Sequence, residues 1–147
     1  MVNSLAFSVA PLPQFWRGEF GNGHILGAMR IRDEQMDAFR EAMLVDFRRR
    51  MLVHLRSVCK AENRVIADLV LQETIETGMR KADMYGFADE KDVERYLTFM
   101  VRYGRDFDTN PRTAWAGEIL RDPDVPDWER MNALEFRDAL EPRRTNE

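Results

Sequence analysis

Apolar residues recur at steps of three and four along most of the chain, which is the spacing of one face of an α-helix. The longest such run begins at Asp33 and ends near Val58, and it predicts a long first helix. The next run predicts a helix that begins at about Asn63, as its N-cap, and stops at Gly86, because glycine readily adopts the left-handed conformation that ends a helix. No segment alternates convincingly with the period of two that is typical of a strand.

Start and stop residues predict three further helices. Asp89 can cap one that ends at Gly104. Asn110 followed by Pro111 begins a short one, because proline is well tolerated in the first turn of a helix. A last helix is expected from about residue 126 to residue 140. The fold class that follows is all-α, a single small helical bundle of about five helices.

The apolar face of each predicted helix supplies the residues expected mainly inside this bundle. They are Met36, Phe39, Met43, Phe47, Met51, Leu55, Ile66, Leu69, Ile75, Val93, Tyr96, Leu97, Met100 and Trp115.

The chain divides into three parts by composition. Residues 1–29 hold four glycines and two prolines among apolar residues and predict an irregular apolar arm, residues 30–141 form the helical domain, and residues 142–147 form a charged tail. The apolar side chains of the arm are expected to pack either on the helical body or on a partner. For a partner, the expected binding residues are Phe15, Trp16 and Phe20, because aromatic side chains commonly supply most of the binding energy of an interface.

The charge of the chain argues against a nucleic-acid partner without removing that alternative. Lys and Arg number 22 against 26 Asp and Glu, for a net charge of −4, whereas a duplex-binding domain is usually basic. The run Arg48, Arg49 and Arg50 could form a basic stripe, but three consecutive residues spread over about 200° of a helix. A solvated or ion-paired face is the simpler interpretation.

The pattern of cysteines and apolar stretches favours a cytoplasmic protein. Cys59 is the single cysteine, so no disulfide can form within the chain, and it is expected to be a buried small side chain. Charged residues interrupt every apolar stretch from Arg30 onward, so no membrane-spanning helix is expected. The first ten residues lack the Lys or Arg of a signal peptide.

The stretch that most resembles a binding site contains Asp106, Asp108 and Asn110, whose oxygens alternate as they do at the start of a calcium-binding loop. The rest of that motif is missing, because its sixth position is Pro111 instead of glycine and its twelfth is Gly117 instead of glutamate. We therefore expect a structural loop whose polar groups brace the corner between two helices.

Catalytic chemistry has no convincing candidate residues. The two histidines are His24 and His54, and the one nearby nucleophile, Cys59, lies about 140° around the helix from His54. With one other soft ligand in the chain, a zinc site is not expected either. The sequence predicts no catalytic residue, no metal and no cofactor.

Residues from about Met29 to Leu140 resemble a group of small, uncharacterised bacterial proteins encoded in type VI secretion loci, near spike proteins and their effectors. The motifs that carry the resemblance are Met29-Arg30-Ile31-Arg32 with Gln35-Met36, Ala82-Asp83-Met84-Tyr85-Gly86, Gly104-Arg105-Asp106-Phe107-Asp108-Thr109-Asn110-Pro111, Trp115-Ala116 and Glu118-Ile119-Leu120.

The resemblance implies a non-catalytic accessory protein that binds a secreted effector or a spike component, as an adaptor or chaperone. Two alternatives stay open at this point. One is an immunity protein that neutralises a cognate toxin, and the other is a nucleic-acid-binding helical domain. The oligomeric state cannot be deduced from these residues.

Overall fold

The structure is a computed structural model that describes residues 33–142, and within this range it contains five α-helices, one 3₁₀ turn and no strand. The elements are α2 (Asp33–Ala61), α3 (Asp68–Met84), α4 (Glu90–Tyr103), η1 (Pro111–Thr113), α5 (Ala114–Arg121) and α6 (Asp127–Leu140). The expected all-α bundle is confirmed. The expected arm, residues 1–29, and residues 143–147 of the expected tail lie outside the described range.

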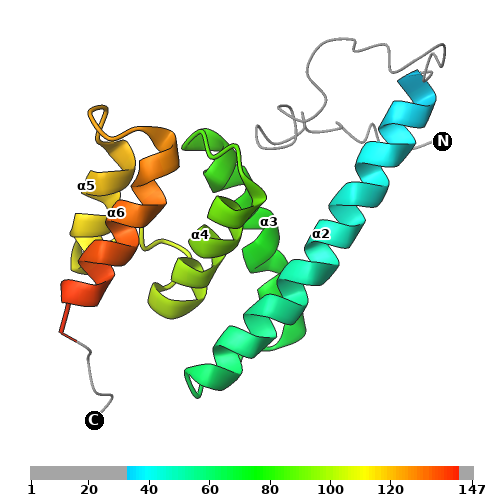
Figure 1. The fold of residues 1–147 in the computed structure, drawn as a ribbon. Coiled ribbons are helices and arrows are strands. Elements are labelled where there is room, and N and C mark those ends of the chain that lie inside the picture. Colours follow the sequence, from blue (N-terminus) through cyan, green and yellow to red (C-terminus); the bar gives the residue numbers. More distant parts are fainter. Residues whose placement is uncertain (1–32, 143–147) are drawn as a thin grey trace, which may run out of the picture.

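Helix α4 lies at the centre of the bundle. It contacts α2 and α3 on one side and α6 on the other, while α5 packs against α6. In Figure 1 the long helix α2 runs along one side of the molecule, the pair α5 and α6 lies on the opposite side, and α3 and α4 lie between them. The half of α2 that begins at Phe47 contains all of its buried residues, so the helices meet along that half.

The connection between α2 and α3 differs from expectation. Asn63 does not cap α3; it follows α2 with a φ of 51°, in the left-handed region. The amide of Arg64 donates to the carbonyl of Cys59 and the amide of Asn63 donates to Lys60, which is the hydrogen-bond pattern of a Schellman motif. Asparagine both caps helix starts and tolerates the left-handed conformation, so its presence did not distinguish a start from an end. Helix α3 begins five residues later, at Asp68.

The end of α3 uses the same motif with the expected glycine. Gly86 has a φ of 81°, and the amide of Phe87 donates to the carbonyl of Ala82. A Schellman motif often places an apolar residue just after the glycine against the helix that it ends. Phe87 occupies that position and is fully buried, although the helical spacing did not predict it as a core residue.

Other predicted helix boundaries are confirmed. The Asp89 carboxylate accepts a hydrogen bond from the amide of Lys91 at the start of α4, and Gly104 ends that helix with a φ of 107°. The Asn110 side chain caps the turn that begins at Pro111, although this turn is 3₁₀ and α5 proper begins at Ala114.

Most of the predicted core residues are buried, but two are exposed. Phe39 is 49% exposed because it lies in the first third of α2, before the part of this helix that meets α3 and α4. Leu69 is 66% exposed, since it lies about 200° around α3 from the buried Leu71. Four further predicted core residues are partly buried, namely Met36, Met43, Ile66 and Trp115.

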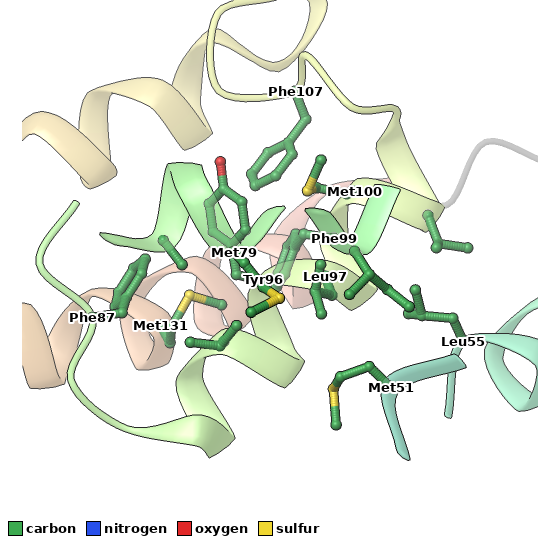
Figure 2. Packing of buried hydrophobic residues seen from close by; sticks show 14 of the residues in the cluster. Met51, Leu55, Met79, Phe87, Tyr96, Leu97, Phe99, Met100, Phe107 and Met131 are labelled. Carbon is green, nitrogen blue, oxygen red and sulfur yellow. The ribbon is translucent and has the colours of Figure 1, made fainter. Parts of the chain in front are cut away.

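The centre of the core is a cluster of aromatic rings from α4 and from the segments that follow α3 and α4. The Tyr96 ring lies 5.1 Å from that of Phe107 and 5.9 Å from that of Phe87, measured between ring centres. Figure 2 shows Phe107 reaching from its loop toward the other side chains of this cluster. Phe99 is also buried, because α4 is covered on two sides and buries more of its circumference than a one-sided helix does.

Truncation of a core ring tests this packing. We expect Phe47→Ala to lower the free energy of unfolding by about 3–5 kcal/mol, because Phe47 is fully buried and its loss leaves a cavity. The matched control is Phe136→Ala on α6, where the ring is 71% exposed and the expected loss is below about 0.5 kcal/mol. Urea unfolding of both variants measures the difference, and similar losses would contradict the burial of Phe47.

Candidate functional site

The segment from Gly104 to Asn110 joins α4 to η1 and is held from two sides. Phe107 is fully buried in the aromatic cluster, and the Asp108 side chain, 5% exposed, points to α3. One carboxylate oxygen of Asp108 accepts a hydrogen bond from Lys81 Nζ at 2.7 Å, and the other accepts one from the Tyr85 hydroxyl at 2.7 Å. This segment therefore attaches the second half of the chain to the end of α3.

Backbone carbonyls of the same segment are also satisfied by side chains. Arg121 Nη2 on α5 donates to the Asp108 carbonyl at 2.6 Å, and the Thr113 hydroxyl donates to the Phe107 carbonyl at 2.7 Å. Lys81 Nζ donates to the Arg105 carbonyl at 2.9 Å in addition to its contact with Asp108. Buried carbonyls that lack such partners would destabilise the fold, so these side chains fix the path of the loop.

The ionisation of this site follows from its contacts. Burial acts to raise the pKa of Asp108, but the hydrogen bonds from Lys81 and Tyr85 outweigh it, so the pKa lies below its ordinary value. Burial, together with the hydrogen bond to Asp108, raises the pKa of Tyr85 to about 12. At neutral pH Asp108 is thus an anion that accepts hydrogen bonds from a cation and a neutral phenol.

Asp106, Asp108 and Asn110, the three residues expected in a structural loop, differ in their burial and in their hydrogen bonds. Asp108 is buried as described, and the Asn110 side chain accepts a hydrogen bond from the amide of Arg112. Asp106 has an exposed side chain, and its carbonyl accepts from the amides of Thr109 and Asn110. Among residues 33–142 no group of three or more His, Cys, Asp and Glu side chains is arranged to hold a metal ion.

The histidine and the cysteine of α2 have different neighbours. His54 Nε2 lies 2.9 Å from the Thr98 hydroxyl, which itself donates to the Glu94 carbonyl, so His54 acts as the donor. Cys59 is 5% exposed, as expected of a buried small side chain, and burial raises the pKa of its thiol.

The arginine run on α2 is ion-paired. Arg48 Nε lies 2.5 Å from a Glu76 carboxylate oxygen, and Arg49 and Arg50 both contact Asp46. Arg50 also pairs with Glu90 at the start of α4. These three side chains therefore join helices or neutralise a neighbour instead of presenting an unpaired basic stripe.

A groove of about 780 Å³ opens where several helices end. Sequence reasoning did not anticipate it, because its residues come from four separate segments. We call it the helix-end groove, and it is lined by Ala61, Glu62, Arg64, Arg102, Tyr103, Asn110, Arg112, Thr113, Trp115, Asp138, Glu141 and Pro142.

Arg102 is the central ion-pairing residue of the helix-end groove. Its Nε lies 2.7 Å from a Glu62 oxygen and its Nη1 lies 2.9 Å from an Asp138 oxygen, so it connects the end of α2 to α6. The Tyr103 hydroxyl donates to the other oxygen of Asp138. Burial, reinforced by this hydrogen bond, raises the pKa of Tyr103 above its ordinary value.

Helix α6 has two apolar faces. Met131 and Leu134 are fully buried against the bundle, whereas Trp128, Phe136 and Leu140 are 68%, 71% and 62% exposed. We call the latter three residues the outer face of α6.

The partner-binding residues expected in the arm, Phe15, Trp16 and Phe20, lie outside the described residues. Among the described helices, none combines the length and the apolar character that crossing a membrane requires. Comparisons of the chain with protein-family models, with curated proteins and with solved structures found no match.

Neutralising Asp108 tests the contact between the loop and α3. We expect Asp108→Asn to lower the free energy of unfolding at neutral pH by about 2–4 kcal/mol, because Lys81 then lacks its anionic partner. The pKa of Asp108 is lowered in the folded protein, so its contribution is present above the unfolded pKa and is lost as the pH falls below about 4. Acidification should therefore destabilise the wild type more than the variant. Urea unfolding at several pH values measures the stability of both proteins. An equal loss of stability in the two on acidification would contradict the assigned role of Asp108.

Two buried glycines provide a second test. A Cβ at Gly117 would lie 2.3 Å from the Asp108 carbonyl oxygen, a backbone atom, whereas a Cβ at Gly78 would meet the ends of the Leu97 and Met100 side chains. Alanine favours a helix by about 1 kcal/mol over glycine, but the loop cannot move away without losing its contacts. We expect Gly117→Ala to lower the melting temperature more than Gly78→Ala. The reverse order would show that the loop adapts easily.

Proposed function

We propose that this chain is a non-catalytic accessory protein that binds another protein through the outer face of α6. The observation that carries the proposal is the exposure of Trp128, Phe136 and Leu140 on the side of α6 that faces away from the bundle. Large aromatic side chains are costly to leave in water and are the usual energetic centres of protein interfaces.

The spacing of these three residues suits a helical interface. Successive members are eight and four positions apart, so they follow one side of α6 within an arc of about 120°. Met131 and Leu134 hold the opposite side of the same helix against the bundle. A partner would therefore meet side chains that project from a fixed helix, which reduces the entropy lost on binding.

The partner that we propose is a secreted effector or a spike component of a type VI secretion system, which this chain serves as adaptor or chaperone. The support for this identity is the family resemblance of the loop and helix motifs between Met29 and Leu140. The proposal places the protein in the cytoplasm before export of its partner. It involves no catalytic step, since the carboxylate and phenol groups with shifted pKa values at Asp108, Tyr85 and Tyr103 join structural elements.

The test uses the full chain, co-expressed with the effector or with the spike protein of its own locus. We expect Trp128→Glu combined with Phe136→Glu to weaken binding by about thirtyfold or more, the effect of losing an interface centre worth about 2 kcal/mol. The control is Leu69→Glu, which changes a similarly exposed side chain on α3 and should bind normally. Binding is measured by calorimetry, and thermal melts should show that all variants fold.

Three outcomes of this experiment would revise the proposal. Absence of binding to both proteins by the wild type would refute it. Suppression of the effector's toxicity on co-expression would replace the adaptor role with that of an immunity protein. Unchanged binding by the α6 variant, with loss of binding in a Phe15→Ala, Trp16→Ala and Phe20→Ala variant, would move the interface from α6 to the arm.

A further inference from the structure

The acidic and the basic side chains that line the helix-end groove differ in whether they are ion-paired. It contains the carboxylates of Glu62, Asp138 and Glu141, and each of them already has a cationic partner within the protein. Glu62 and Asp138 pair with Arg102, and Glu141 pairs with Arg137. The negative charge of the groove is therefore neutralised before any ligand arrives.

Two arginines of the same groove have no carboxylate partner among residues 33–142. Arg64 donates from Nη2 to the Arg102 carbonyl at 2.7 Å, a contact that leaves its charge uncompensated. The Arg112 side chain makes no ion pair or hydrogen bond within residues 33–142. Both residues are exposed. A protein with a net charge of −4 thus presents, at one groove, two guanidinium groups that no carboxylate of the described residues neutralises.

The groove also has an aromatic wall. The Tyr103 and Trp115 rings meet edge to face, with centres 5.9 Å apart, and both side chains are partly exposed. Asp138 fixes Tyr103 through a hydrogen bond. The Thr113 hydroxyl, two residues before Trp115, donates to the Phe107 carbonyl of the anchored loop. An apolar side chain of a ligand could pack on this wall while its neighbours reach the arginines.

We propose that the helix-end groove binds an acidic, extended segment of the partner protein, with an apolar side chain on Trp115 and carboxylates on Arg64 and Arg112. This inference rests on the proposed function, because it takes the ligand to be part of a protein. Arginine favours carboxylates through paired hydrogen bonds from its planar group. A nucleic acid fits less well, because two arginines at one groove are fewer cations than a row of closely spaced phosphates requires.

The experiment titrates the full chain, labelled for NMR, with a synthetic peptide of sequence EEDFEDFEE. We expect shifts of the Trp115 indole and of the Arg64 and Arg112 side-chain signals, and we expect binding to weaken as salt is added. The uncharged peptide QQNFQNFQQ should bind at least about tenfold more weakly, because it lacks carboxylates. Equal binding of the two peptides, or shifts located elsewhere, would overturn the proposal.

Charge reversal in the groove provides the matched comparison. Arg112→Glu should weaken binding of the acidic peptide at least about tenfold without unfolding the protein, because this side chain has no partner in the described part of the chain. The control is Arg80→Glu on α3, which also changes an exposed arginine that lacks a carboxylate partner among residues 33–142 and lies outside the groove lining. Similar effects of the two variants would refute the site. Tighter binding of an oligothymidylate than of the peptide would also refute it.

The outcome of the peptide experiment can be distinguished from the outcome of the test of the proposed function. If the peptide binds in the groove but the effector and spike proteins do not bind the chain, the groove stands and the proposed function fails. If a partner protein binds through α6 while Arg112→Glu changes neither its affinity nor that of the peptide, the proposed function stands and the groove fails.

Discussion

The buried contact of Asp108 with Lys81 and Tyr85 is the constraint on which the second half of the molecule depends. It fixes the loop after α4 to the end of α3, and the same loop inserts Phe107 into the core. Because Gly117 lies against the Asp108 carbonyl, the position of α5 follows from that of the loop. Helix α6 is then placed by its contacts with α4 and α5. Both proposed interaction surfaces therefore depend on a carboxylate that contacts neither ligand.

Arginines join most of the helices of this acidic protein. Arg50 connects α2 to α4, Arg95 connects α4 to α6, and Arg102 connects the end of α2 to α6 through two carboxylates. Such partly exposed pairs contribute modestly to stability, but they determine which charges remain available to a ligand. Net charge is thus a poor guide to the local field. In a chain with an excess of carboxylates, the helix-end groove has two arginines, Arg64 and Arg112, that pair with no carboxylate in the described part of the chain.

The two proposed surfaces are adjacent at the end of α6. Leu140 belongs to its outer face, and Glu141 and Pro142, the next residues of the chain, line the helix-end groove. A partner could therefore place an apolar patch on α6 and an acidic segment in the groove at the same time. Two linked contacts bind more tightly than either alone, because the second forms at a high effective concentration. The apolar contact would supply most of the affinity and the charged one would favour particular partners.

The sequence by itself determined the elements that depend on local chemistry. The apolar period of α2, the caps at Asp89 and Asn110 and the helix ends at Gly86 and Gly104 depend on residues a few positions apart, and all of these were predictable. Asn63 was misassigned because asparagine suits either end of a helix.

The tertiary structure alone decided the features that depend on which surfaces meet. A helical period shows that a face is apolar but not whether another helix covers it, which is why the exposure of Phe39 and Leu69 and the two-sided burial of α4 were missed. The helix-end groove and the Lys81 contact of Asp108 join residues far apart in the chain, and no local spacing encodes such a pairing.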